Sequence, residues 1–161
     1  MDLMQLLLKE FKLLLLAAMP IIELRGAIPA GMVMGLDPLT SATISFIGSM
    51  LPVPFILFGM KPVLEFMRRF KWAEKFLDWI VNRTVKRAKN FDKYSFYGLM
   101  LFVAVPLPTT GVWTGSMAAS IFGMKVKRSF FAILLGNLIA AFVITAGSTF
   151  AASIFEKIPL L

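Results

Sequence analysis

The chain has 161 residues, of which 58% are hydrophobic, and it carries a formal net charge of +8. This apolar fraction is well above that of a typical soluble domain, so the composition predicts an integral membrane protein. The absence of cysteine excludes disulfides and thiolate metal sites, and the absence of histidine excludes His-dependent nucleophilic catalysis. We expect no cleaved signal peptide, because the first residues lack a basic region and a small-residue cleavage site.

The positive charge is concentrated in residues 61–93, between two hydrophobic halves. Basic segments beside membrane spans mark the cytoplasmic side and attract anionic lipid. We therefore expect membrane lipids, and not nucleic acid, as partners. No metal, cofactor or enzymatic reaction is expected, because the sequence offers no acid pair or metal-ligand cluster.

The first half begins with an amphipathic turn or two and continues as an apolar stretch over residues 13–22. Ten helical residues rise about 15 Å, which is half the thickness of the hydrocarbon core. A second apolar stretch of similar length, residues 27–36, follows a charged tip rich in proline and glycine. Two half-length arms joined in this way predict a re-entrant helical hairpin, closed by the helix-start signal Asp37-Pro38.

Residues 39–60 are long enough to span the membrane. Within them, Gly48-Ser49 and the prolines at 52 and 54 predict close packing and a kink. Lys61-Pro62 is expected to end the first half.

Residues 63–93 differ from both halves. Apolar residues recur there at alternating spacings of four and three, which predicts one stripe of a helix with charged residues on its other faces. With Trp72 and Trp79, such a basic amphipathic helix suits a membrane surface. A solvated charged linker helix has the same pattern, so both interpretations stay open.

The second half follows the same order as the first. Residues 95–105 form an apolar arm, residues 106–111 a second tip, residues 112–124 an outgoing arm and residues 130–155 a second span. The residues predicted to shape the two tips are Gly26, Pro29, Gly31, Pro106, Pro108, Gly111 and Gly115.

An ungapped alignment of the halves supports an internal repeat. It pairs Gly35 with Gly123, Ser41 with Ser129, Gly48 with Gly136 and Ser49 with Asn137. Upstream, small gaps place Gly26 and Gly31 opposite Gly111 and Gly115. Because Ser49 and Asn137 occupy matched places in the two spans, we expect them to make interhelical hydrogen bonds.

If each hairpin returns to its own side, only the two spans cross, and the repeats are inverted, as in many secondary transporters. The predicted fold is one all-α integral membrane domain with two such repeats, residues 1–60 and 94–161. Each repeat is a re-entrant helical hairpin plus a transmembrane helix, and residues 61–93 join them as a basic amphipathic helix. Residues 61–93 and the basic corner Lys125–Arg128 then fall on one side of the membrane, which we expect to be the cytoplasmic side. The membrane is expected to be the plasma membrane of a prokaryotic-type cell.

The two tips carry the motifs Glu23-Leu24-Arg25-Gly26-Ala27-Ile28-Pro29 and Pro106-Leu107-Pro108-Thr109-Thr110-Gly111-Val112-Trp113-Thr114-Gly115. This pair of motifs resembles the small multidrug export protein family, a branch of the DedA-like superfamily of membrane transporters. The resemblance implies re-entrant hairpins, proton-dependent transport and translocation of lipid carriers such as undecaprenyl phosphate. Those relatives tend to have charged residues in both hairpins, whereas the second tip of this chain has threonines and a tryptophan.

Glu23 and Arg25 are the first candidate site residues, because an ionisable group in hydrocarbon is costly and usually functional. Glu23 is a candidate proton carrier, and the alternative is a fixed ion pair with Arg25 that pins the tip. Arg25 is a candidate for binding an anionic headgroup through its planar fork. Its alternative role is to hydrogen-bond the free carbonyls at the end of the first arm.

The second tip offers hydroxyls and one large aromatic ring as further candidates. Thr109, Thr110 and Thr114 either bind substrate or satisfy nearby backbone carbonyls. Trp113 either stacks on an organic cation or a lipid chain, or packs between the hairpins.

These features predict a small secondary transporter in which both tips meet near the midplane. An amphipathic or lipid-phosphate substrate would pass between them, driven by proton or sodium exchange at Glu23. The alternative is a non-transporting membrane protein that scaffolds a partner complex or affects lipid packing. A homodimer is expected in the first case, because two spans per chain would enclose a pathway only thinly.

Overall fold

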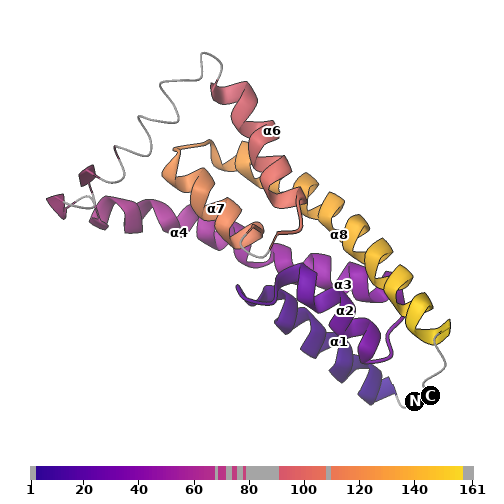
Figure 1. Ribbon diagram of the computed structural model, residues 1–161. Coiled ribbons are helices and arrows are strands. Elements are labelled where there is room, and N and C mark those ends of the chain that lie inside the picture. The colour runs from indigo at the N-terminus through magenta and orange to yellow at the C-terminus, as the bar shows by residue number, and fades with distance from the viewer. Residues whose placement is uncertain are drawn as a thin grey trace. The chain divides into compact units, whose positions relative to one another are not determined.

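The computed structural model describes residues 3–67, 69–71, 74–75, 78, 91–107 and 110–157. This part of the chain consists of helices and their connections and contains no strand, so the predicted all-α class is confirmed. Its helices are α1 (Leu3–Ala18), α2 (Glu23–Val33), α3 (Pro38–Met50), α4 (Pro52–Met67), α6 (Phe91–Ala104), α7 (Val112–Ile121) and α8 (Val126–Lys157), as labelled in Figure 1.

Contacts divide the chain into two compact units. The first unit comprises Met1–Leu51 and Asn137–Leu161, and it contains α1, α2, α3 and the C-terminal part of α8. The second unit, Pro52–Gly136, contains α4, α6, α7 and the N-terminal part of α8. Each unit therefore combines one pair of short helices with parts of both long apolar stretches.

Two helical stretches are long and apolar enough to cross a membrane, Pro38–Met60 and Val126–Ile154. Large apolar side chains on both are exposed, including Phe55 at 79% and Phe142 at 71%. Such exposure is unfavourable in water and favourable in hydrocarbon. The chain is therefore a membrane protein, as its composition predicts.

The first of these stretches is interrupted at Leu51, between α3 and α4. The Leu51 N–H donates to Gly48 O at 3.3 Å, which tightens the last turn of α3. Pro52 and Pro54 follow at once and have no N–H to continue the helical pattern. The two prolines predicted to kink the span therefore lie directly after this interruption.

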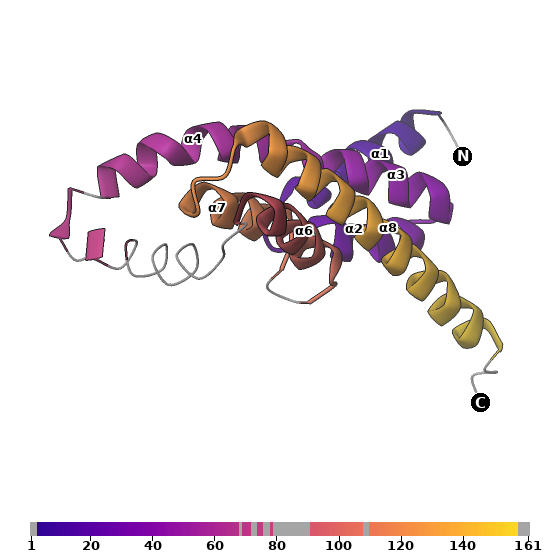
Figure 2. The same ribbon diagram turned by 90° about the horizontal axis from the view of Figure 1, so that it is seen from above.

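The first hairpin turns between α1 and α2, and both helices pack against α3, as both views show (Figures 1 and 2). Gly26, Pro29 and Gly31 lie inside α2, so the turn falls earlier in the chain than the density of proline and glycine predicts. Glycine here makes room for a neighbouring helix, because a Cβ on Gly31 would lie 2.7 Å from Ser41 Oγ. Pro29 removes one backbone donor without ending α2, which packing against other helices permits.

The second helix of each hairpin ends in the same type of turn. Gly35 and Gly123 have φ values of 84° and 66°, in the left-handed region that favours glycine. The backbone hydrogen bonds are the same in both turns: Met34 to Ala30, Gly35 to Met32 and Leu36 to Gly31 in one, and Phe122 to Ala118, Gly123 to Ser120 and Met124 to Ala119 in the other.

Two further glycines allow helices to cross closely. A Cβ on Gly48 of α3 would lie 2.5 Å from Leu14 O of α1. A Cβ on Gly136 of α8 would meet Met100 O of α6 equally closely. Small residues at such crossings let membrane helices pack backbone to backbone.

The apolar stretch ends at Met60, directly before Lys61-Pro62, whereas the helix α4 continues through Pro62 to Met67. A proline costs a helix one hydrogen bond, yet its φ is compatible with helix, and here it is not a terminator. Most of the amphipathic helix predicted for residues 63–93, including Trp72 and Trp79, lies outside the described residues.

Candidate functional site

Glu23 is an acidic residue buried by the first hairpin. It is only 9% exposed and is the first residue of α2, directly after the turn. Its φ is +47°, the one positive value among the non-glycine residues that the structure describes. Left-handed backbone costs an L-residue about 1–2 kcal/mol. Strained backbone at a buried charged side chain is typical of functional sites.

Local contacts hold Glu23 in this conformation. Its N–H donates to Met19 O at 3.0 Å across the turn. The next residues of α2 anchor the helix, because Leu24 and Ile28 are buried in one apolar cluster with Ala140 of α8. The backbone of Glu23 is therefore fixed between a hydrogen-bonded turn and an apolar anchor.

Arg25 brings a positive charge to the same turn of α2. It is half-buried, and its guanidinium is attracted to the Glu23 carboxylate. The positive end of the helix dipole favours the carboxylate at this position and disfavours the guanidinium. An ion pair with Glu23 and the binding of an anionic substrate both use the guanidinium of Arg25. The two roles predicted for Arg25 can therefore alternate.

α3 carries a row of small polar side chains in the interior of the first unit. Its members, spaced four residues apart and fully buried, are Ser41, Ser45 and Ser49. On α2, Glu23 and Gly31 lie on one stripe, two helical turns apart. Because Gly31 is in close contact with Ser41 and the two helices are antiparallel, helical spacing places Glu23 level with Ser49.

A hydrogen bond joins α3 to α8 at Ser49. Asn137 Nδ2 donates to Ser49 Oγ at 2.8 Å, and Ser49 Oγ donates to Phe46 O at 3.0 Å. Asn137 is 3% exposed, so its amide is held in place in the interior. This is the interhelical hydrogen bond expected for the pair.

Three buried hydroxyls in the first unit, those of Ser41, Ser45 and Thr145, have no hydrogen-bond partner within the described chain. A buried hydroxyl without a partner costs about 1–3 kcal/mol. Ser129, at the place that matches Ser41, instead donates to Lys125 O at 3.2 Å. Ser41 and Ser45 are not among the predicted site residues, although the spacing of four between serines in an apolar helix is a signal that identifies them.

The second unit has its own turn, between α6 and α7. Thr110 is 9% exposed, and its Oγ1 donates to Val105 O at 2.7 Å and to Leu107 O at 3.1 Å. This hydroxyl therefore holds the turn together, which favours the structural alternative for Thr110. Thr114 is exposed and donates to Gly111 O at 3.4 Å.

The remaining predicted residues of this turn occupy different places. Trp113 is half-buried in the first turn of α7, Gly111 directly precedes that helix, and Gly115 lies inside it. Pro106 is exposed in the turn, whereas Pro108 and Thr109 lie outside the described residues. The predicted residues thus fall into two sets: Glu23, Arg25, Ser49 and Asn137 in the first unit, and Thr110, Trp113 and Thr114 in the second.

The residues of the first unit can bind charged ligands. Among the described residues no group of three or more His, Cys, Asp or Glu side chains is placed to hold a metal ion. A carboxylate and a guanidinium in one helical turn can bind a proton or cation and an anionic group, respectively.

A family model described as "Putative small multi-drug export protein" matches residues 23–143. This range begins at Glu23, the first residue of α2, and includes the turn between α6 and α7. No curated protein and no solved structure matches the chain.

Proposed function

The chain belongs to the small multi-drug export protein family, and from this premise we propose that it is a secondary transporter of an amphipathic or lipid-phosphate substrate. Transport is coupled to a proton or a sodium ion at Glu23. The observation that carries this proposal is the buried Glu23 with positive φ, two residues from the half-buried Arg25.

Helix lengths support re-entrant hairpins. α1 has 16 residues and α2 has 11, which correspond to about 24 Å and 16 Å. α6 has 14 residues and α7 has 10. All four are shorter than the hydrocarbon core of about 30 Å, so each hairpin enters and leaves the membrane on one side.

The Ser49–Asn137 bond supports inverted repeats. These residues are 88 positions apart, as are the glycines of the two matching turns. Equivalent residues of a repeat touch each other only close to the two-fold axis that exchanges them. In inverted-repeat transporters that axis lies in the membrane plane, close to the substrate site. The proposal therefore assigns Glu23 to the midplane.

At the midplane Glu23 and Arg25 act as an exchange pair. Ionised Glu23 attracts the guanidinium of Arg25. Proton binding at Glu23 removes this attraction and makes Arg25 available to a phosphate headgroup. Release of the proton on the other side restores the pair and displaces the headgroup, so that proton and substrate move together.

The rest of the proposal concerns orientation and assembly. Residues 61–93 and Lys125 face the cytoplasm, following the positive-inside rule. Two copies form a homodimer that completes the wall around the pathway. A common origin with DedA-like transporters accounts for the motifs at both tips.

The test is uptake driven by a proton gradient in proteoliposomes, with a lipid phosphate and an organic cation as alternative substrates. Glu23→Gln and Arg25→Ala are expected to abolish lipid-phosphate uptake, whereas Glu10→Gln, which neutralises a carboxylate on α1, retains it. Wild-type protein that transports neither compound and co-purifies with a partner would contradict the proposal and favour a scaffold.

A further inference from the structure

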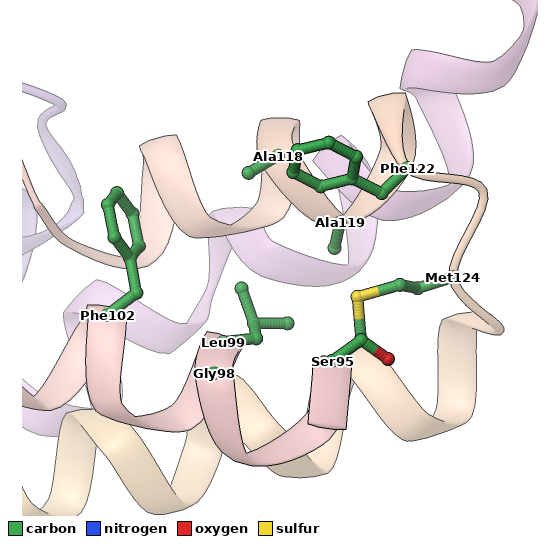
Figure 3. Close-up of a pocket in the computed structure, with 8 residues that line it drawn as sticks. All are labelled: Ser95, Gly98, Leu99, Phe102, Ala118, Ala119, Phe122 and Met124. Carbon is green, nitrogen blue, oxygen red and sulfur yellow. The ribbon is translucent and has the colours of Figure 1, made fainter. Parts of the chain in front are cut away.

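The second unit contains an apolar groove between α6 and α7, with a volume of about 260 Å³ (Figure 3). Leu99 and Phe102 of α6 point towards α7, and Ser95 and Met124 lie together at one end of the groove. The volume equals that of roughly nine water molecules in the liquid. It accommodates a segment of one hydrocarbon chain and is too small for a whole two-chain lipid.

The first unit has a lysine at the corresponding place. The contacts of Gly48 with Leu14 and of Gly136 with Met100 show which residues of α1 and α6 correspond, and this register pairs Lys9 with Ser95. Lys9 Nζ donates to Met34 O at 2.7 Å, at the end of α2. Its four-carbon stem therefore runs from α1 to the end of α2, whereas Ser95 is too short to cover the same region between α6 and α7.

Charge at the mouth also differs between the two units. Asp37 follows the turn of the first hairpin, where its carboxylate accepts the Thr40 N–H at 2.9 Å. The matching residue after the second hairpin is Lys125, which is exposed, as is Lys127. The first unit therefore has Lys9 and Asp37 at this place, whereas the second unit has Lys125 and Lys127.

We propose that the groove between α6 and α7 binds one acyl chain of an anionic membrane lipid, with the phosphate headgroup beside Lys125. Apolar lining and a basic rim complement the two parts of such a lipid. In the first unit, the Lys9 stem and the Asp37 carboxylate take the corresponding positions, so that unit binds no lipid there. The groove contains none of the residues of the Glu23–Arg25 site. The lipid site can therefore be tested independently of transport.

The test is native mass spectrometry of the full chain in detergent, titrated with lysophosphatidylglycerol or with lysophosphatidylcholine of the same chain length. Wild-type protein is expected to bind one anionic lipid per chain, at least about fivefold more tightly than the zwitterionic one. Ser95→Lys, which supplies the lysine stem found in the first unit, is expected to weaken binding of both lipids about tenfold or more. Ser95→Ala retains wild-type binding.

Three further variants separate the contributions of groove and rim. Lys125→Asp is expected to remove the preference for the anionic lipid while binding of the zwitterionic one persists. Gly98 lines the groove and a Cβ there would meet nothing within 4 Å, so Gly98→Leu is expected to narrow the groove, and it substitutes for Ser95→Lys if that variant does not fold. The double variant Lys9→Ser with Asp37→Lys is expected to gain a second bound lipid.

Equal binding of the two lipids by wild-type protein would overturn the proposal. So would unchanged binding by both groove variants when each melts at the wild-type temperature.

Discussion

Glu23 combines charge, burial and a left-handed backbone in one residue, and each of these features has a separate energetic cost. The residues on both sides of Glu23 are well ordered by contacts: its N–H is hydrogen-bonded across the turn, and the next residues of α2 are packed in an apolar cluster. The positive φ of Glu23 therefore lies within a packed segment. A residue kept under such conditions is best explained by a requirement for its carboxylate. Sequence alone identifies Glu23 and Arg25 as candidates, because charge in an apolar run is visible there. It does not reveal the positive φ, which depends on how α1 and α2 pack.

Two substitutions separate strain from charge at this position. Glu23→Gln removes the charge and keeps the strain, whereas Glu23→Gly removes both, so the glycine variant is expected to be more stable by about 1 kcal/mol. The measurement is thermal unfolding in detergent. A glutamine variant that is at least as stable as the glycine variant would show that the backbone at this position is relaxed.

Asp37 provides a test in acid. Hydrogen bonds from the Thr40 hydroxyl and then from its N–H lower the pKa of the Asp37 carboxyl below its ordinary value. A lowered pKa in the folded state means that this stabilisation is full above the unfolded pKa and is lost as pH falls through the folded pKa, below about pH 4. Asp37→Asn keeps a hydrogen-bond acceptor but does not titrate. The difference in free energy of unfolding between wild type and this variant should therefore shift against wild type as the pH falls. A difference that does not change with pH would contradict this role.

Among the elements, the expected order of short arms and long apolar stretches is present, but α1 and α2 begin and end earlier than the predicted arms. Local effects of proline and glycine on the backbone explain three of the helix boundaries. These are the start of α3 after Asp37, the interruption at Leu51 and the start of α7 after the second tip. Pro29 and Pro62 lie inside helices, where packing outweighs the loss of one hydrogen bond. Gly26 and Gly31 were expected to shape the tip of the hairpin, and the close packing of Gly31 against Ser41 depends on a neighbour that periodicity does not identify.

The close crossings predict a position-dependent response to an added methyl group. Gly136→Ala is expected to destabilise the protein by about 1–3 kcal/mol, because its Cβ would meet Met100 O. Gly147→Ala lies in the same helix, where a Cβ meets nothing within 4 Å, and by helix propensity it should be neutral or stabilising. Similar melting temperatures for the two variants would mean that α6 and α8 do not pack closely at Gly136.

For the whole molecule, the central question is the orientation of the two hairpins in the membrane. The sequence predicts inverted repeats from the order of elements and the positions of basic residues. The matching turns after α2 and α7 and the Ser49–Asn137 bond agree with a repeat, and labelling from the two sides of the membrane tests the orientation of its halves. The absence of cysteine from the chain makes this measurement simple, because single cysteine variants have no background.

Leu39 and Lys127 are exposed, matching positions just inside α3 and α8. We expect an impermeant maleimide to label Leu39→Cys only from outside the cell and Lys127→Cys only from inside, because inverted repeats place these positions on opposite surfaces. Labelling of both variants from one side would exclude inverted topology.

The most direct test of transport through the first hairpin is access to its turn from both sides of the membrane. Ile21 lies two residues before Glu23 and is 93% exposed, so Ile21→Cys leaves the packing intact. In oriented vesicles, an alternating-access transporter is predicted to show labelling of this cysteine from both sides, in proportions that shift with an imposed proton gradient and no longer shift when Glu23→Gln is added. Labelling from a single side under every gradient would contradict the account.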